Sequence, residues 1–328
     1  MNIYDIAKEA NVSIATVSRV MNNKQNISPK TRRRVEAVLQ KYNYTPSSIA
    51  RGLASSSMRM VGMVMQDIRN THYIDMAYVI EQELRKKGFC CLFCNTDDPD
   101  PSNAFQMLRD FRVDGIILIG SVFMNEATER AIDCYHPSTK IVFVNGVLER
   151  ENVCSIQCDD RYGIEITVEH LIGRGHSGIL YIDDMDTDSA RRKREGYCTA
   201  MGRHFPGYGE EHMVRAPVMG FAGGYEAMKA LLEREEAFTA VVCSEDVVAL
   251  GAIRALEERE LRIPQDVAVA GFNNAWVGKL SRHELTSADT GLSLMGVEAT
   301  RALCDRLEGI QRPDRITLTP KLFVGNTT

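Results

Sequence analysis

From residue 60 onward, short apolar runs alternate with segments in which apolar residues recur every three to four positions. Short apolar runs bounded by turn residues are typical of buried strands, and the longer spacing is typical of helices with one buried face. Strands are expected at 60–66, 88–94, 114–120, 140–145, 178–183, 240–244 and 266–272. Helices are expected at 73–87, 102–111, 125–134, 162–172, 189–201, 223–234, 246–259 and 293–308. This alternation predicts two parallel sheets covered by helices, with a ligand cleft beyond the carboxyl ends of their strands.

The first 42 residues have a different pattern, which predicts three short helices around a small core. The expected core side chains are Ile3, Ile6, Ala7, Ala10, Val17, Val20, Met21, Val35, Val38, Leu39 and Tyr42. The second helix would expose Ile14, Ala15, Ser18, Arg19 and Asn22. Ser28 and Pro29 form a cap and first-turn pair that opens the third helix. Two short helices joined by a tight turn predict a helix-turn-helix, whose second helix enters the major groove of DNA. The alternative is a solvated helical hairpin.

Charge is distributed unevenly along the chain. Residues 1–57 contain nine Lys and Arg against three Asp and Glu, a net charge of +6, whereas the whole chain carries −5 and the remainder therefore −11. A small basic segment on an acidic protein favours a polyanionic partner for that segment alone.

The composition is that of a globular protein of two or three domains, with 328 residues, 44% of them hydrophobic and 25% charged. No apolar run approaches the roughly 20 residues that span a bilayer, and the first ten residues lack the apolar stretch of a signal peptide. We therefore expect a cytoplasmic protein with no membrane partner. Nine cysteines without regular spacing indicate reduced thiols. Cys91 and Cys94 match a C-x-x-C motif, but on a strand they would face opposite sides.

No catalytic or metal-binding motif is recognisable in the sequence. Residues 173–178 match G-x-G-x-x-G, yet they follow an expected helix and precede an expected strand, the reverse of the dinucleotide-binding order. There is no G-x-S-x-G, no Walker loop and no Cys/His spacing typical of a metal site. We expect neither enzymatic activity nor a cofactor or metal.

Two segments carry a specific resemblance. VSIATVSRVMN (12–22) and ISPKTRRRVEAVLQKYNYTPSSIARGLA (27–54) resemble the DNA-binding head and hinge of the lactose-repressor/galactose-repressor (LacI/GalR) family. The resemblance implies a small all-α helix-turn-helix head and a periplasmic-binding-protein-like α/β body of two doubly wound parallel-sheet subdomains. It further implies a head at 1–45, a hinge and linker at 46–59 and a body at 60–328. Within the body, the N-subdomain would comprise about 60–158 and 289–318, and the C-subdomain about 159–288 and 319–328.

The resemblance also assigns roles on DNA. Ile14 and Ala15 match positions that tune operator choice, and Arg19 matches an arginine that reads a base, which suits bidentate pairing with guanine. Phosphate-contacting positions are matched by Ser13, Thr16, Asn22 and Asn26. Ser18 lies on the same exposed face.

The hinge has its own implied chemistry. Leu53 matches the family's leucine that wedges into the minor groove, and Ala50 lets two hinge helices approach closely. Ser47 replaces the usual Asn, which keeps a capping role but weakens the case for a DNA contact. Eight residues are too few for a stable isolated helix, so 47–54 is expected to become helical only on the operator.

The implied effector cleft departs from the family in several places. Tyr73 keeps an aromatic ring for stacking, whereas His72 replaces another aromatic residue. Asn273 replaces an aspartate that grips ligand hydroxyls, and Lys193 replaces an arginine. The residues expected at the cleft are His72, Tyr73, Asn145, Asp159, Lys193, Arg194, Glu245, Asn273 and Trp276. Trp276 is equally well explained by core or interface packing. A polar pocket of this kind suits a sugar or a nucleoside-like ligand.

These observations predict a sequence-specific transcriptional regulator, most simply a repressor. Its homodimer would bind double-stranded operator DNA under the control of a small-molecule effector. One alternative is a catabolite-control-type regulator whose corepressor is a protein docked on the N-subdomain. A solute-binding protein of a transport system is disfavoured by the basic head.

Overall fold

A computed structural model describes residues 2–21, 27–44, 57–135, 138–234 and 237–328. The predicted DNA contacts Asn22, Asn26, Ala50 and Leu53 lie outside these residues, as does Ser47. The described chain forms two compact units, Met1–Met58 and Arg59–Thr328.

The first unit is a three-helix head made of α1 (Ile3–Glu9), α2 (Ile14–Met21) and α3 (Pro29–Lys41). Its core contains Ile6, Ala7, Ala10, Val17, Val20, Val35 and Val38, as the apolar spacing predicts. Tyr42 is an exception, because it is 40% exposed and stacks against the Lys41 ammonium, with 4.8 Å between Nζ and the ring centre. Tyr44, two residues further on, packs against the core instead.

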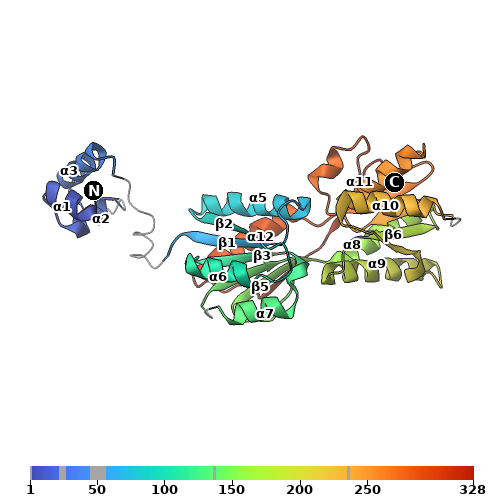
Figure 1. Cartoon of the computed structure of the whole chain (residues 1–328), viewed down its shortest axis with the longest axis horizontal. Coiled ribbons are helices and arrows are strands. Elements are labelled where there is room, and N and C mark those ends of the chain that lie inside the picture. The colour runs from blue at the N-terminus through green and yellow to red at the C-terminus, as the bar shows by residue number, and fades with distance from the viewer. Residues whose placement is uncertain (1, 22–26, 45–56, 136–137, 235–236) are drawn as a thin grey trace. The chain divides into compact units, whose positions relative to one another are not determined.

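The N-subdomain is built on a parallel sheet whose strands lie in the order β11-β5-β4-β3-β1-β2 (Figure 1). Its elements are β1 (Met60–Met65), α5 (Thr71–Lys86), β2 (Cys90–Asn95), α6 (Ser102–Asp110), β3 (Gly115–Ile119), η1 (Ser121–Phe123), α7 (Glu126–Asp133), β4 (Lys140–Val144), β5 (Val153–Cys158), α12 (Leu292–Leu307) and β11 (Arg315–Leu318). Helices α5 and α12 cover one face, and α6 and α7 cover the other.

The C-subdomain is built on a second sheet in the order β12-β10-β9-β8-β6-β7, parallel except for β12. Its elements are α8 (Asp160–Gly173), β6 (Ile179–Asp183), α9 (Asp188–His204), η2 (Glu210–His212), β7 (Met213–Arg215), α10 (Gly220–Leu232), β8 (Ala240–Cys243), α11 (Asp246–Glu258), β9 (Ala268–Phe272), η3 (Trp276–Lys279), β10 (Thr286–Asp289) and β12 (Lys321–Phe323). Helices α10 and α11 cover one face, and α8 and α9 the other. The predicted fold class is thereby confirmed.

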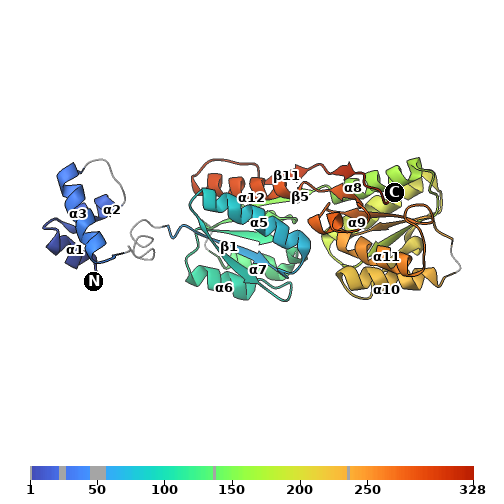
Figure 2. The same cartoon turned by 90° about the horizontal axis from the view of Figure 1, so that it is seen from above.

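The chain passes between the two sheets three times. It leaves the first sheet after β5, returns after β10 to form α12 and β11, and leaves again to form β12. Helix α12 then lies beside α5, more than 200 residues away in sequence (Figure 2). Both subdomains are therefore assembled from segments that are distant in the sequence.

Several strands are not predicted by the hydrophobic pattern because they are short or polar. Strand β10 (Thr-Ser-Ala-Asp) is buried over its first three residues although it is polar. The Thr286 backbone N–H donates to Thr327 Oγ1, and the hydroxyl groups of Thr286 and Thr328 lie 2.8 Å apart. Strands β7 and β12 have three residues each, too few to show a period.

Two motifs behave as the sequence predicts. The G-x-G-x-x-G segment joins the end of α8 to β6, and Gly175 adopts φ +94°, the left-handed geometry of a helix terminus. On β2, Cys91 packs toward the core under α5 and Cys94 toward the core under α6. The two thiols thus lie on opposite faces of the sheet and do not form a redox pair.

Candidate functional site

The outer face of α2 is the candidate DNA-reading surface. Ile14, Ala15 and Arg19 are exposed, and Ile14 keeps 39% of its surface in solvent although it is apolar. Ser13 caps the helix by accepting from the Thr16 backbone N–H at 3.2 Å, and the two hydroxyl groups lie 2.9 Å apart. Ser18 is half-buried on the same helix. The tight turn before α2 is set by Asn11, whose φ is +49°.

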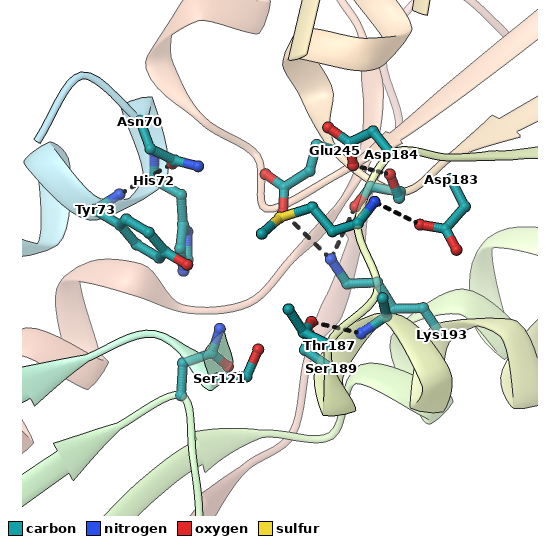
Figure 3. A pocket seen from close by; sticks show the side chains of 14 residues that line it. Asn70, His72, Tyr73, Ser121, Asp183, Asp184, Thr187, Ser189, Lys193 and Glu245 are labelled. Atoms are coloured by element: carbon teal, nitrogen blue, oxygen red, sulfur yellow. Dashed lines mark hydrogen bonds and ion pairs between the residues drawn. The ribbon is translucent and has the colours of Figure 1, made fainter. Parts of the chain in front are cut away.

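A polar cleft lies where the carboxyl ends of the two sheets face each other (Figure 3). Its walls come from the first turn of α5, from the segments after β3 and β4, and from the ends of β6 and β8 with the start of α9. The lining residues are Asn70, His72, Tyr73, Ser121, Asn145, Asp183, Asp184, Met185, Thr187, Ser189, Ala190, Lys193, Ser244 and Glu245. This is the position that the doubly wound topology predicts for a ligand.

The N-subdomain contributes an aromatic wall. Asn70 caps α5 and accepts from the backbone N–H groups of His72 and Tyr73, at 2.9 and 3.4 Å, which turns both rings toward the cleft (Figure 3). Gly120, with φ +117°, makes room for Tyr73, because a Cβ at that position would lie 2.8 Å from the phenol oxygen. Tyr73 is therefore held by the end of β3.

His72 is a neutral hydrogen-bonding group in this wall. Burial, together with the nearby charge of Lys193, lowers the pKa of His72 to about 3. Its Nδ1 is buried and has no hydrogen-bond partner among the described residues. A buried polar atom without a partner is costly, so a ligand that bonds to it gains affinity.

The C-subdomain contributes a buried ion pair. Lys193 Nζ donates to the Ser244 carbonyl at 2.8 Å, lies 3.4 Å from Glu245 Oε1, and sits 4.1 Å from the centre of the Phe272 ring. Burial by itself would lower the pKa of Lys193, but Glu245, Asp160 and Asp184 outweigh it and the pKa is raised. Lys193 is therefore a permanent cation.

Glu245 titrates near neutrality. Its burial raises the pKa to about 7, with Asp184 acting in the same direction and Lys193 opposing both. The second oxygen, Oε2, accepts from the Asn273 side-chain amide at 2.7 Å. Both oxygens thus have protein partners and still have lone pairs for ligand hydroxyl groups.

Asp183 and Asp184 are two buried acids that strand-end reasoning on 178–183 overlooked. Asp183 accepts from Arg194 at 2.6 Å, and Asp184 accepts from Ser244 Oγ at 2.9 Å and from the Gly220 backbone N–H at 2.9 Å. Both fit the rule that ligands bind beyond the carboxyl ends of parallel strands, because Asp183 is the last residue of β6 and Asp184 follows it. They give the C-subdomain wall a clear excess of acceptors.

Asp159, Arg194, Asn273 and Trp276, all predicted for the cleft, are not among its lining residues. Asp159 caps α8 by accepting from Tyr162, and Arg194 is engaged by Asp183 and Asp186 at the edge of the cleft. These two have local structural partners that the sequence pattern does not show.

The other two lie behind or beside the cleft. Asn273, with φ +99°, contacts it only through Glu245. Trp276 is 49% exposed, and its backbone N–H donates to the Asp75 carboxylate on α5, which links the two subdomains. By contrast, the structure brings together His72, Tyr73, Asn145, Lys193 and Glu245.

The described residues contain no group of three or more His, Cys, Asp or Glu side chains placed to hold a metal ion. Among the described helices, none is long and apolar enough to cross a membrane.

Comparison with known proteins agrees with this architecture. Residues 2–47 match the family model for bacterial regulatory proteins of the lacI family, and residues 168–328 match a periplasmic binding protein-like domain. An HTH-type transcriptional regulator of Lachnoclostridium phytofermentans is 32% identical over 332 residues, covering 100% of this chain and 99% of the relative. The HTH-type transcriptional repressor PurR of Haemophilus influenzae is 30% identical over 338 residues, covering 98% and 97%. A LacI-family regulator structure from Silicibacter pomeroyi superposes with a TM-score of 0.82 at 25% identity, covering 100% and 99%.

The chain therefore belongs to the LacI/GalR family of transcriptional regulators. It is a DNA-binding regulator under effector control, in a family of proteins that are not enzymes.

Proposed function

We propose that this protein is a repressor whose operator affinity is set by a neutral, polyhydroxylated ligand, a sugar or a nucleoside, bound in the cleft. The observation that carries the proposal is the acceptor-rich wall of Asp183, Asp184 and Glu245 opposite the ring of Tyr73. Carboxylates accept from ligand hydroxyl groups, and an aromatic face packs against a ring. A strongly anionic ligand is disfavoured because Lys193 is the only cation among the described lining residues.

The proposed mechanism is linkage between the cleft and the head. A ligand that binds one arrangement of the two subdomains more tightly shifts the protein toward it, and operator affinity changes by the same differential free energy. On the head, Ile14 and Ala15 would select the operator and Arg19 would read a base. Such a regulator acts where the chromosome is, in the cytoplasm.

We also propose that the protein binds its operator as a homodimer. The body exposes large apolar side chains that a single chain leaves uncovered, including Tyr78 on α5 and Leu280 after η3, at 65% and 72% exposure. Packing against a second copy would remove these side chains from water, which favours association. Sedimentation of the full-length protein tests this, since a monomer at micromolar concentration would contradict it.

A matched ligand panel tests the effector class. Thermal unfolding of the full-length protein is measured with ribose, adenosine and their phosphorylated counterparts, and hits are confirmed by calorimetry. Neutral members should raise the unfolding temperature more than phosphorylated ones. The opposite order would refute the proposed ligand chemistry. If no small molecule binds while a partner protein captures the N-subdomain and alters operator affinity, the protein-corepressor alternative replaces the proposal.

A further inference from the structure

A second hollow lies on the N-subdomain and is lined by residues of α6 and of the end of α7. These two helices cover the face of the first sheet opposite α5 and α12 (Figure 1). The hollow has a volume of about 210 Å³ and shares no lining residue with the effector cleft. Its floor is aromatic, because the rings of Phe105 and Tyr135 meet edge to face with their centres 5.7 Å apart. Ala131 and Cys134 extend this floor along α7.

The floor holds a polar atom without a partner. Tyr135 is only 7% exposed, and within the described part of the chain its hydroxyl group has no hydrogen-bond partner. Burial raises the pKa of Tyr135 to about 12, against the opposing effect of Arg109. The hydroxyl group therefore keeps its proton and can donate to an acceptor.

The rim of the groove is cationic. Arg109 is exposed and, among the described residues, has neither an ion pair nor a hydrogen bond through its guanidinium group. Arg130 pairs with Glu126 at 3.3 Å, but both side chains are largely exposed, so this pair contributes little and is easily exchanged. No acid is present among the groove's described lining residues.

We propose that this groove is a second ligand site, which binds a small organic acid. The carboxylate accepts from the Tyr135 hydroxyl group and pairs with Arg109 and Arg130, because planar guanidinium groups match carboxylates well. The apolar body of the acid covers Phe105 and the side of α7. The site is independent of the effector cleft and takes the opposite charge class.

Cys134 provides a direct test, because its exposed thiol lines the groove. The full-length protein is alkylated with iodoacetamide, and the rate at each cysteine is followed by peptide mass spectrometry. Benzoate is the probe, benzamide its uncharged counterpart, and inorganic phosphate a bare oxyanion. Cys90, exposed on β2, is the internal control. Benzoate should slow alkylation of Cys134 and leave Cys90 unchanged, and benzamide and phosphate should protect only weakly.

Variants separate the proposed contacts. Tyr135→Phe keeps the ring and should raise the half-protecting benzoate concentration roughly tenfold, as expected for losing a hydrogen bond to a charged group. Arg109→Gln should also weaken protection, whereas Arg259→Gln, which changes an arginine at the end of α11, should not. Absence of benzoate protection at millimolar concentration overturns the site. If benzamide protects Cys134 as well as benzoate does, the groove does not recognise the carboxylate charge. If phosphate protects equally well, the apolar body of the ligand contributes nothing to binding. An unchanged Tyr135→Phe variant overturns the role of the hydroxyl group.

Discussion

Replacing Lys193 by Met should cost the body a large part of its stability, because it leaves Glu245 buried without its cation. Breaking one side of a buried ion pair destabilises proteins by about 3–5 kcal/mol. The variant also loses the hydrogen bond from Lys193 to the Ser244 carbonyl and the contact between Lys193 and Phe272. We therefore expect a loss of stability in the upper half of that range at pH 8. Glu245→Gln in the same chain should restore much of the loss, since the uncompensated charge is then gone.

The loss should depend on pH in a defined direction. The pKa of Glu245 is raised to about 7 in the folded protein, so ionisation of this group destabilises the fold. The free energy of unfolding therefore falls as the pH rises from the pKa that Glu245 has in the unfolded chain toward 7. Without Lys193 this pKa rises further, which extends the fall above pH 7. Each pH unit of that extension is worth about 1.4 kcal/mol. The variant should therefore be closer to wild type at pH 6 than at pH 8, by about 1 kcal/mol.

Urea unfolding at the two pH values measures both effects. Trp276 is the only tryptophan of the chain and lies in the C-subdomain, so its fluorescence reports the relevant unit. A loss under about 1 kcal/mol at pH 8, or a double variant no more stable than Lys193→Met, would refute the description of Glu245 as a buried charge held by Lys193.

Four further outcomes are expected. Arg19→Ala should weaken operator binding by about 1–3 kcal/mol in fluorescence anisotropy, and an equal loss on random DNA would show a phosphate contact instead. Gly120→Ala should lower the free energy of unfolding by at least about 1 kcal/mol, because φ +117° is strained for alanine. It should also weaken ligand binding, because the new Cβ would collide with Tyr73, and normal ligand binding would contradict the close contact between Gly120 and Tyr73. Asn273→Ala should weaken the ligand's effect on operator binding through Glu245 while sparing ligand-free operator affinity, and a normal response would contradict a positioning role of Asn273 on Glu245. Affinity for a neutral hydroxylated ligand should fall from pH 8 to pH 6 in calorimetry as Glu245 gains a proton, and pH-independent binding would exclude a contact with this carboxylate.

The fold was largely predictable because its central strands are buried on both faces and form continuous apolar runs. Strand β3, all of whose residues are buried, is of this kind. Strand β10 shows the limit, since Thr286 and Ser287 are buried but polar, and hydrogen bonds between their hydroxyl groups and the distant Thr328 and Asp246 explain their burial. Such long-range partners are absent from any local pattern.

The cleft was predictable to the extent that strand ends were considered. Glu245 follows β8, and Asp183 and Asp184 end and follow β6, so the strand-end rule points to all three. Lys193 lies within α9 and is expected only from the resemblance to the family. Trp276 lies four residues past the end of β9, where the chain has already entered η3, and it is not among the residues that line the cleft. A residue at or directly after the end of a strand is therefore a better candidate for the cleft than a residue several positions further along the chain.

The interleaved order of the two subdomains has a practical consequence for dissecting the protein. A fragment that ends after β10 would lack α12 and β11, although everything it retains from the first 158 residues is intact. Met295, Ala299 and Leu303 of α12 fill the core beneath α5, so removing residues 290–328, about the last eighth of the chain, would expose the interior of the subdomain that is made first. Nonsense mutations near the 3′ end of the gene should therefore be as damaging as early ones. A single protease cut at one crossing would leave both halves held together by the other two.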